Sequence, residues 1–255
     1  MVSVLSRWRC VSLRCMSASW QTVRQPNDSR GSSVIAHEKR ELESLDYPPI
    51  PWRSPAWMAK RAMDVAIATA LLIVLSPLML LVALAVKLAD SGPVLFAWDV
   101  LGVGGLPIRS HKFRTMIVRA EAMESALREQ GRNEMSSVYF KIKNDPRVTP
   151  VGRLLRRFSL DELPSLWSVV KGDMSLVGPR PVRLVEAPYL KPWHYERFIV
   201  RPGLTSPWVV AGKGNIRDFD EIAASDIKYI RTWSIARDLQ ILLATAVYIA
   251  SGANH

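Results

Sequence analysis

Cysteine is nearly absent from this sequence of 255 residues, in which Cys10 and Cys15 are the only two. They lie close together near the start of the chain, so they do not supply the disulfide framework of a small secreted fold. They do not indicate a zinc site either, because His37 is the only histidine near them. No internal repeat is visible. The rest of the chain is free of cysteine, which is compatible with a reducing compartment.

Acidic residues are also in short supply, with 23 aspartates and glutamates against 34 lysines and arginines, and the formal net charge is +11. A surplus of this size favours anionic partners, such as nucleic acid, acidic lipid headgroups or phosphorylated substrates. Hydrophobic residues make up 49% of the chain, which argues against a wholly disordered protein. The length is that of one or two domains with a sizeable core.

The apolar residues are concentrated in one uncharged run of 22 residues, 65–86, with Lys60 and Arg61 before it and Lys87 after it. At about 1.5 Å per residue, a helix of this length reaches across the roughly 30 Å hydrocarbon core of a bilayer. The run begins too far from the N-terminus, and is too long, for the apolar region of a signal peptide. We therefore expect a membrane segment here.

Ser76 and Pro77 interrupt this run near its middle. Proline removes a backbone hydrogen bond and predicts a kink, and the adjacent serine can bond the carbonyl that is freed. The pattern fits either a kinked helix that spans the membrane or a helix–break–helix hairpin that enters and leaves on one side. Positive charge at both ends favours the hairpin. Asp64, at the start of the membrane segment, is expected to pair with a cation such as Arg61.

Composition divides the chain into three regions. Residues 1–58 form a basic, proline-containing extension that we expect to be poorly ordered, 59–90 contain the membrane segment, and 91–255 form one further domain. Two short strands are expected within 92–116, around a glycine-rich turn. The helices expected in this domain cover 117–130, 149–158, 161–170, 219–229 and 235–250. These elements predict an α+β fold that is predominantly helical.

Basic residues gather around turns and helix ends in this domain: Lys112, Arg114, Arg147, Arg153, Arg156, Arg157, Arg180, Arg183 and Arg201. Among them lies the segment S-L-D-E-L-P, 159–164, which carries the adjacent carboxylates of Asp161 and Glu162. On a helix the two would point about 100° apart, so one can face a bound group while the other holds a cation. The alternative is a capping box, in which Ser159 and Glu162 satisfy a helix N-terminus. In either case, a positive helix end and nearby arginines predict lowered pKa values for both carboxyls.

Further motifs occur in a fixed order: K-R-A-M-D (60–64), S-G-P-V-L-F (91–96), H-K-F-R-T-M (111–116), N-D-P-R-V-T-P-V-G-R-L-L-R (144–156), K-G-D-M-S-L-V-G-P-R-P (171–181), R-P-G-L-T (201–205) and D-x-x-Y-x-x-x-W-S (226–234). With the Ser76–Pro77 break and S-L-D-E-L-P, they make the chain closely resemble the bacterial sugar transferases. These are polyprenyl-phosphate hexose-1-phosphate transferases, also called monotopic phosphoglycosyl transferases. The resemblance covers about residues 59–251.

The resemblance implies a monotopic membrane protein with interfacial helices, in which 59–90 is a re-entrant hairpin broken at Ser76–Pro77. It places the chain at the bacterial inner membrane, with 91–255 as a catalytic domain that faces the cytoplasm. The implied reaction moves a sugar-1-phosphate from a UDP-sugar to undecaprenyl phosphate and releases UMP, which initiates exopolysaccharide or glycoconjugate synthesis. Other implied partners are membrane lipids, downstream glycosyltransferases and a second copy of the chain, but not nucleic acid.

By the same resemblance, Asp161 is the nucleophile that forms a phosphosugar-aspartyl intermediate, and Glu162 binds Mg²⁺. These roles agree with physical chemistry, because a carboxylate that attacks a diphosphate is repelled unless cations neutralise the phosphates. Mg²⁺ takes carboxylate and phosphate oxygens and keeps several waters, which suits a single glutamate. Five basic residues are expected to bind the substrate phosphates, the first two most strongly: Arg156, Arg180, Lys112, Arg114 and Arg147.

The chain departs from the family pattern at five positions, which are Trp98, Val100, Ser206, Val209 and Lys213. The family has Gln, Arg, Gly, Gln and Arg there, so the changes remove polar groups that contact nucleotide or sugar. They motivate a second hypothesis, a non-catalytic scaffold of a polysaccharide assembly complex. A third, a membrane-attached nucleic-acid binder, rests only on the net charge of +11 and lacks a recognisable reading motif.

Overall fold

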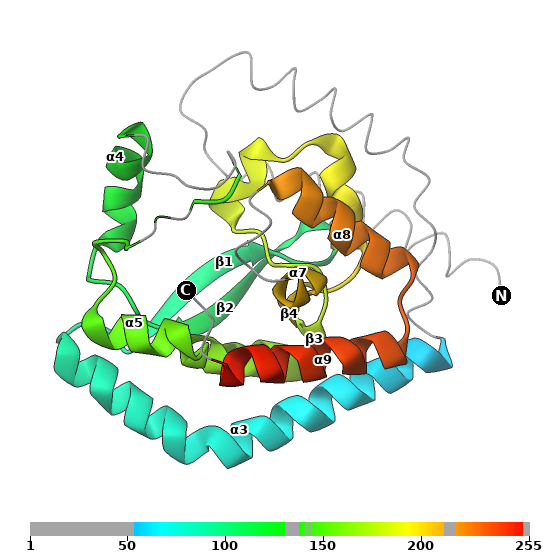
Figure 1. Ribbon diagram of the computed structural model, residues 1–255, viewed down its shortest axis with the longest axis horizontal. Coiled ribbons are helices and arrows are strands. Elements are labelled where there is room, and N and C mark those ends of the chain that lie inside the picture. The colour runs from blue at the N-terminus through cyan, green and yellow to red at the C-terminus, as the bar shows by residue number, and fades with distance from the viewer. Residues whose placement is uncertain (1–53, 131–137, 141, 143, 212–217, 252–255) are drawn as a thin grey trace, which may run out of the picture.

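The computed structural model describes residues 54–130, 138–140, 142, 144–211 and 218–251, so the predicted extension, 1–58, lies almost entirely outside the described residues. Figure 1 shows one long helix, α3, running beneath a body that the other elements build. In chain order the elements are α3 (Pro55–Ala89), β1 (Leu95–Leu101), η2 (Val103–Gly105), β2 (Pro107–Phe113), η3 (Ala120–Met123), α4 (Glu124–Glu129), α5 (Pro150–Arg157), η4 (Leu160–Ser165), α6 (Leu166–Lys171), β3 (Ser175–Val177), η5 (Leu184–Tyr189), η6 (Pro192–Ile199), β4 (Gly203–Thr205), α7 (Pro207–Val210), α8 (Phe219–Arg231) and α9 (Ile235–Ala250), where η marks a 3-10 helix. The expected α+β, predominantly helical class is confirmed.

The two strands expected within 92–116 are present as the antiparallel hairpin β1–β2. Leu95 faces Phe113 at the open end, and Leu101 faces Pro107 next to the turn. The turn contains the short helix η2, in which Gly104 has a φ of 67°, a conformation that favours glycine. The hairpin therefore follows from strand-forming residues on both sides of a glycine-rich turn.

A second sheet pairs two short parallel strands from distant parts of the chain. In β3 and β4, Ser175 lies opposite Gly203 and Val177 lies opposite Thr205. The two backbones approach closely just beyond the ladder, where a Cβ atom on Gly203 would lie 2.1 Å from the backbone nitrogen of Gly178. A side chain does not fit there, so glycine is required for the strands to pair.

Three of the expected helices begin at residues with capping side chains. The hydroxyl of Thr149 accepts a hydrogen bond from the Gly152 N–H at 2.9 Å and starts α5. Asp218 caps α8 and Ser234 caps α9 in the same way. Side-chain caps satisfy N–H groups that the first turn leaves unpaired, so these helices are confirmed close to their predicted boundaries.

The helix expected over 117–130 is wrong as a single element. Arg119 has a φ of 68°, in the left-handed region, and it interrupts any helix that would begin at residue 117. The chain then forms the 3-10 helix η3 and the short helix α4. The spacing of apolar residues over 117–130 is that of one helix, but the spacing contains no information on the backbone conformation of a single residue such as Arg119.

The apolar run forms a single 35-residue helix, α3, that contains Pro77. Pro77 lacks the N–H that would bond the carbonyl of Ile73, and the hydroxyl of Ser76 donates to that oxygen instead, at 2.8 Å. Figure 1 shows that α3 bends, and that both of its arms rise toward the rest of the body. The expected kink, with a serine that bonds the freed carbonyl, is confirmed.

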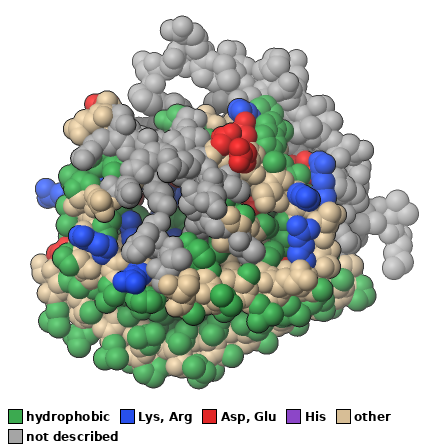
Figure 2. Space-filling view, viewed as in Figure 1, with side chains coloured by type: hydrophobic (Ala, Val, Ile, Leu, Met, Phe, Trp, Pro, Cys, Tyr) green, Lys and Arg blue, Asp and Glu red, His purple; other side chains and the backbone are tan. Residues whose placement is uncertain are grey.

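Both arms of α3 pack against the same body. Ala68, in the first arm, belongs to a core cluster with Leu166 of α6 and Ile241 of α9. Val86, in the second arm, packs with Phe113 of β2 in another cluster. Between these contacts α3 exposes large apolar side chains, the most exposed of which include Ile73, Val74, Leu80 and Leu81. Figure 2 shows this apolar surface along the lower edge of the molecule. By its length and composition α3 could cross a membrane, and its exposed apolar surface indicates membrane association.

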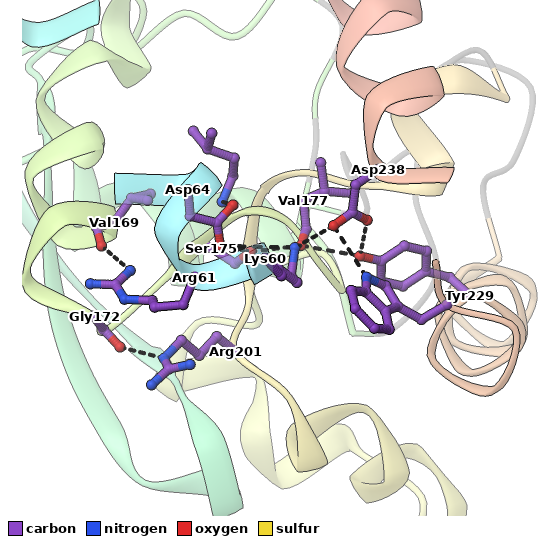
Figure 3. Close-up of polar contacts among 12 residues, drawn as sticks. Lys60, Arg61, Asp64, Val169, Gly172, Ser175, Val177, Arg201, Tyr229 and Asp238 are labelled. Carbon is purple, nitrogen blue, oxygen red and sulfur yellow. Dashed lines mark hydrogen bonds and ion pairs between the residues drawn. The ribbon is translucent and has the colours of Figure 1, made fainter. Parts of the chain in front are cut away.

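A buried ion pair joins the first arm of α3 to the body. The ammonium group of Lys60 lies 2.6 Å from a carboxylate oxygen of Asp238 and 3.0 Å from the carbonyl of Val177 (Figure 3). Asp238 also accepts hydrogen bonds from the hydroxyl of Tyr229 and the indole N–H of Trp233. Lys60 is 4% exposed and Asp238 is 0% exposed, so both charges are neutralised inside the protein.

Asp64 pairs with a cation, as predicted, but the cation is Lys60, at 3.8 Å, and not Arg61. Asp64 also accepts hydrogen bonds from the hydroxyl of Ser175, at 2.7 Å, and from the backbone N–H of the next residue in β3. Arg61 donates to the carbonyls of Val169 and Val170 at the end of α6, as Figure 3 shows for the first of them. Asp64 lies one turn after Lys60 and faces β3, whereas Arg61 faces the negative end of α6.

The burial of Lys60 predicts that its replacement will destabilise the protein. Lys60→Met leaves the carboxylate of Asp238 buried without its positively charged partner, so the free energy of unfolding should fall by about 3–5 kcal/mol. Thermal and denaturant unfolding in detergent micelles would measure this. Lys87→Met, at the exposed end of the same helix, is the matched control and should change it by less than about 0.5 kcal/mol. Equal effects of the two variants would contradict a structural role for the ion pair.

Candidate functional site

An open cleft lies between β2, η4 and the segment that joins β4 to α7. It holds about 530 Å³ of empty space and is lined by Trp98, Lys112, Glu162, Met174, Arg180, Pro181, Gly203, Leu204, Thr205, Ser206, Trp208 and Val209. Three of the predicted site residues, Lys112, Glu162 and Arg180, therefore meet at one cleft although they are far apart in the sequence. The residues on its other walls are mostly apolar.

The acidic pair lies at a sharp change of direction between α5 and η4. Ser159 has a φ of 52° and its side chain makes no capping hydrogen bond, so the capping-box interpretation is wrong. The segment that follows is a 3-10 helix, not the start of the α-helix expected over 161–170, and Pro164 lies inside it. The Ser165 hydroxyl donates to the carbonyl of His111, at 2.8 Å, and holds η4 against β2.

Glu162 forms an ion pair with Lys112. The ammonium group lies 2.8 Å from a carboxylate oxygen of Glu162, and it also lies 3.9 Å from the centroid of the Trp98 ring. Lys112 is thus held by a carboxylate and by an aromatic face. This contact fixes one carboxylate of the acidic pair at the cleft.

Asp161 has a raised pKa, so the predicted lowering is wrong for this residue. Burial is the main cause, and the neighbouring carboxylate of Glu162 raises the pKa further. The positive charges of Lys112 and Arg156 lower it, but they do not outweigh the loss of solvation. Further positive charge at the site would favour the ionised form of both carboxyls.

The other predicted phosphate ligands divide into two groups. Arg156 lies near both carboxylates, and its Nε donates to the Thr115 hydroxyl at 2.9 Å. The guanidinium of Arg180 lies between two aromatic rings, 4.4 Å from the centroid of Tyr139 and 4.2 Å from that of Trp208. Lys112 and Arg180 thus bring positive charge to the cleft. Asp161 and Arg156 are not among the residues that line it, but both lie near Glu162, which does.

Arg114 and Arg147 lie elsewhere, in buried structural contacts. Arg114 pairs with Asp90 and donates to the carbonyl of Pro93, which fastens the chain just after α3. Arg147 pairs with Asp145, at 2.6 Å, and donates to the carbonyl of Ala120. Neither lines the cleft. The structure does not bring them to the acidic pair, and their role in phosphate binding stays a prediction.

The donor set fits a magnesium ion only as a partial site. No group of three histidine, cysteine or acidic side chains in the described part of the chain could enclose a metal. Asp161 and Glu162 offer carboxylate oxygens, which Mg²⁺ prefers, and waters or phosphate oxygens would have to complete its octahedral shell. The raised pKa of Asp161 also agrees with a cation at this place, because a divalent ion would offset the repulsion between the two carboxylates.

The departures from the family pattern occupy different places. Trp98, Ser206 and Val209 line the cleft, whereas Val100 is fully buried in β1 and Lys213 lies outside the described residues. The indole N–H of Trp98 and the hydroxyl of Ser206 are buried and have no hydrogen-bond partner among the described residues. Polar groups are therefore still present at two of the altered positions.

Sequence reasoning missed the two aromatic residues that hold Arg180. Trp208 follows the R-P-G-L-T motif (201–205) and lies between two of the positions that depart from the family pattern, Ser206 and Val209, which was a usable signal. Tyr139 lies in no motif, and only the fold brings it to Arg180. Two aromatic residues that contact the same arginine from distant segments produce no local sequence pattern from which the contact could be predicted.

Comparisons with known proteins identify related chains. Residues 55–252 match the family model described as Bacterial sugar transferase. The galactosyl transferase CpsE of Streptococcus agalactiae is 41% identical over 166 residues, which cover 64% of this chain and 36% of that protein. A UDP-glucose:undecaprenyl-phosphate glucose-1-phosphate transferase of Caulobacter vibrioides is 41% identical over 204 residues, 77% of this chain and 71% of the relative. An undecaprenyl-phosphate galactose phosphotransferase of Salmonella typhimurium is 38% identical over 191 residues, 73% of this chain and 39% of the relative.

The raised pKa of Asp161 predicts that this residue destabilises the empty site. An aspartate whose pKa is higher in the folded chain than in the unfolded one binds protons more readily when folded, so stability falls as the pH rises above the unfolded value of 3.8. Asp161→Asn should therefore unfold at a higher Tm than the wild type at pH 7, by about 2 °C or more, and the difference should vanish near pH 4. Differential scanning fluorimetry without Mg²⁺ would measure it.

Asp145→Asn is the matched control and should have the opposite sign. Burial raises the pKa of Asp145, but hydrogen bonds from Arg147 outweigh burial and lower the pKa overall. The ionised form therefore stabilises the fold at neutral pH, and its removal should lower the Tm. An Asp161→Asn variant no more stable than the wild type at pH 7 would contradict the raised pKa.

Proposed function

Because this chain belongs to the bacterial sugar transferase family, we propose that it transfers a sugar-1-phosphate from a UDP-sugar to undecaprenyl phosphate and releases UMP. The name of the Caulobacter relative contains UDP-glucose and undecaprenyl phosphate, and that of the Salmonella relative contains undecaprenyl phosphate. The chain spans only 36% of the length of CpsE and 39% of the length of the Salmonella protein. The observation that carries the proposal is the acidic pair Asp161–Glu162. Glu162 lines one cleft with Lys112 and Arg180, and Arg156 lies near both carboxylates of the pair. Downstream glycosyltransferases would then extend the lipid-linked product.

The proposed reaction has two displacements at one phosphorus. An oxygen of Asp161 bonds to the phosphorus that carries the sugar, the bond to UMP breaks, and UMP leaves with the electron pair. An oxygen of undecaprenyl phosphate then attacks the same phosphorus, and Asp161 leaves as a carboxylate. A covalent intermediate allows the soluble and lipid substrates to use the site in turn.

The residues around Asp161 supply the electrostatic part of this reaction. A carboxylate is repelled by a diphosphate, so the positive charges of Lys112, Arg156 and Arg180 must offset the phosphate charge. Mg²⁺, held by Glu162, would add two further positive charges there. The same cations would also lower the pKa of Asp161, which burial raises, and would so favour its ionised, nucleophilic form.

The packing of α3 supports a re-entrant topology. Lys60 near one end and Val86 near the other contact the same body, which carries the cleft. A helix that crossed the bilayer would place these two ends on opposite sides. We therefore propose that α3 enters and leaves on the cytoplasmic side of the inner membrane, where UDP-sugars are made available by metabolism.

Helix α9 is the proposed interfacial helix. It lies beside α3 in Figure 1, with Ile241 buried against the body. Leu243 and Val247, on its outer side, are exposed. An amphipathic helix whose apolar side faces outward next to a membrane segment fits the headgroup boundary.

A label-transfer assay tests the nucleophile. The wild type, incubated with Mg²⁺ and a UDP-sugar labelled in the sugar-bearing phosphate, should release UMP and retain label on the protein. Asp161→Asn should lose at least about a thousandfold of this activity, because the amide does not attack phosphorus. Asp99→Asn, which removes an exposed ion pair with Arg109, is the control and should label normally. A wild type that labels with none of the common UDP-sugars would favour the scaffold hypothesis.

Cysteine accessibility tests the topology. In a Cys10→Ser/Cys15→Ser background, Ala56→Cys and Ser91→Cys should react with an impermeant maleimide from the same side of sealed inverted vesicles. Val74→Cys, in the exposed apolar part of α3, should react only after detergent is added. Labelling of positions 56 and 91 from opposite sides would contradict the re-entrant arrangement.

A further inference from the structure

We propose that the buried pair Arg197–Asp226 positions Arg180 for binding the nucleoside diphosphate part of the donor. This inference rests on the proposed function, because it assigns residues that serve the same cleft. Neither residue of the pair lines the cleft. Both act through contacts with the main chain of Arg180, and we therefore call them positioning residues.

The pair contacts both polar groups of the Arg180 main chain. The backbone N–H of Arg180 donates to a carboxylate oxygen of Asp226 at 3.2 Å. The carbonyl of Arg180 accepts from Nη2 of Arg197 at 2.8 Å. That Nη2 and the Nε of Arg197 also donate to the same oxygen of Asp226, at 2.6 and 3.0 Å. One carboxylate oxygen and one guanidinium thus hold a single residue from both sides.

The surroundings make this contact rigid. Arg197 is 1% exposed and lies in η6, and Asp226 is 0% exposed and lies in α8. The guanidinium of Arg197 also lies 5.0 Å from the centroid of the Phe219 ring, inside the core. Charged side chains buried this deeply need a fixed partner geometry, because a displaced partner leaves an unpaired charge.

The side chain of Arg180 is held as firmly as its main chain. Its guanidinium lies between the rings of Tyr139 and Trp208, and the residue lines the cleft that contains Glu162. Restricting a long, flexible side chain before the substrate arrives removes an entropy loss that would otherwise weaken binding. The aromatic rings fix the end of the side chain, and the Arg197–Asp226 pair fixes its base.

If the Arg197–Asp226 pair only stabilised the fold, opposite charges at the two positions would be enough, and the hydrogen bonds to the Arg180 main chain would not be needed. Lysine at position 197 could still neutralise Asp226, but its single ammonium group cannot reproduce the planar fork that bonds both Asp226 and the Arg180 carbonyl. Arg197→Lys therefore keeps the charge and removes the proposed positioning contact. Asp226→Glu, which keeps the negative charge and moves the carboxylate by one methylene, is the second variant.

The test is a double-mutant cycle on the binding of UDP with Mg²⁺, measured by calorimetry on the full chain in detergent. Arg180→Ala should weaken UDP binding by about tenfold or more, the loss expected for a charge-assisted hydrogen bond. Arg197→Lys should weaken it by about fivefold in the wild type but by less than about twofold when Arg180 is already alanine. Asp226→Glu should behave in the same way, which keeps the test valid if one variant folds poorly.

Arg231→Lys is the matched control. Arg231 and Glu196 form another ion pair between α8 and η6, at 2.8 Å, but they are partly exposed and do not contact Arg180. This variant should leave UDP affinity within about twofold of the wild type. It separates positioning of Arg180 from any general effect of an ion pair that joins the two helices.

The outcomes separate this inference from the proposed function. Losses from Arg197→Lys and Arg180→Ala that multiply in the double variant would overturn the inference, as would an Arg197→Lys protein with wild-type affinity. Unchanged affinity in Arg180→Ala would overturn it too, because the pair would then position a residue that binds nothing. All three results leave the Asp161 label-transfer assay intact. A wild type that does not bind UDP would overturn both the inference and the proposed function.

Discussion

Lys60 lies near the N-terminal end of α3, and its positive charge is neutralised by the body of the protein. The way in which α3 packs against that body depends on this contact. Lys60 is buried by the rest of the protein, which supplies its partners, Asp238 and the Val177 carbonyl. An unpaired charge at this depth costs several kcal/mol, so α3 cannot slide or rotate without losing both contacts. Val177 belongs to β3, and β3 pairs with β4, whose residues line the cleft. One cation thus connects α3 to the pair of strands that reaches the cleft.

The acidic pair presents a different electrostatic problem, because one of its two adjacent carboxyls is poorly solvated. Glu162 is balanced by Lys112, and burial raises the pKa of Asp161 in spite of the positive charges of Lys112 and Arg156. A site of this kind is less stable when empty than when it holds cations, because bound positive charge removes the unfavourable interaction. Stability is lost at the position where reactivity is needed, a trade-off that catalytic sites often show.

Local signals in the sequence were enough for the parts of the structure that form from neighbouring residues. Thr149 at the start of α5, the glycine turn between β1 and β2, and the Ser76–Pro77 bend each depend on a few consecutive side chains. Pairings between distant segments were not accessible in the same way. Nothing near Arg114 indicates that Asp90 will pair with it, and the neighbours of Asp161 suggested a lowered pKa because burial is a property of the fold. The cleft residues Lys112, Glu162 and Arg180 could be predicted because each lies in a motif that the chain shares with the family, and not because a local pattern connects them.

The bend in α3 has a consequence for the membrane as well as for the protein. If both arms enter and leave through one face, the exposed side chains of Ile73, Val74 and Leu80 take up area among the acyl chains of that monolayer only. Added area on one side of a bilayer favours bending toward that side. A helix that the Ser76 hydroxyl keeps intact across a proline would then act as a wedge, and the shape of the surrounding bilayer would contribute to how strongly the protein is retained there.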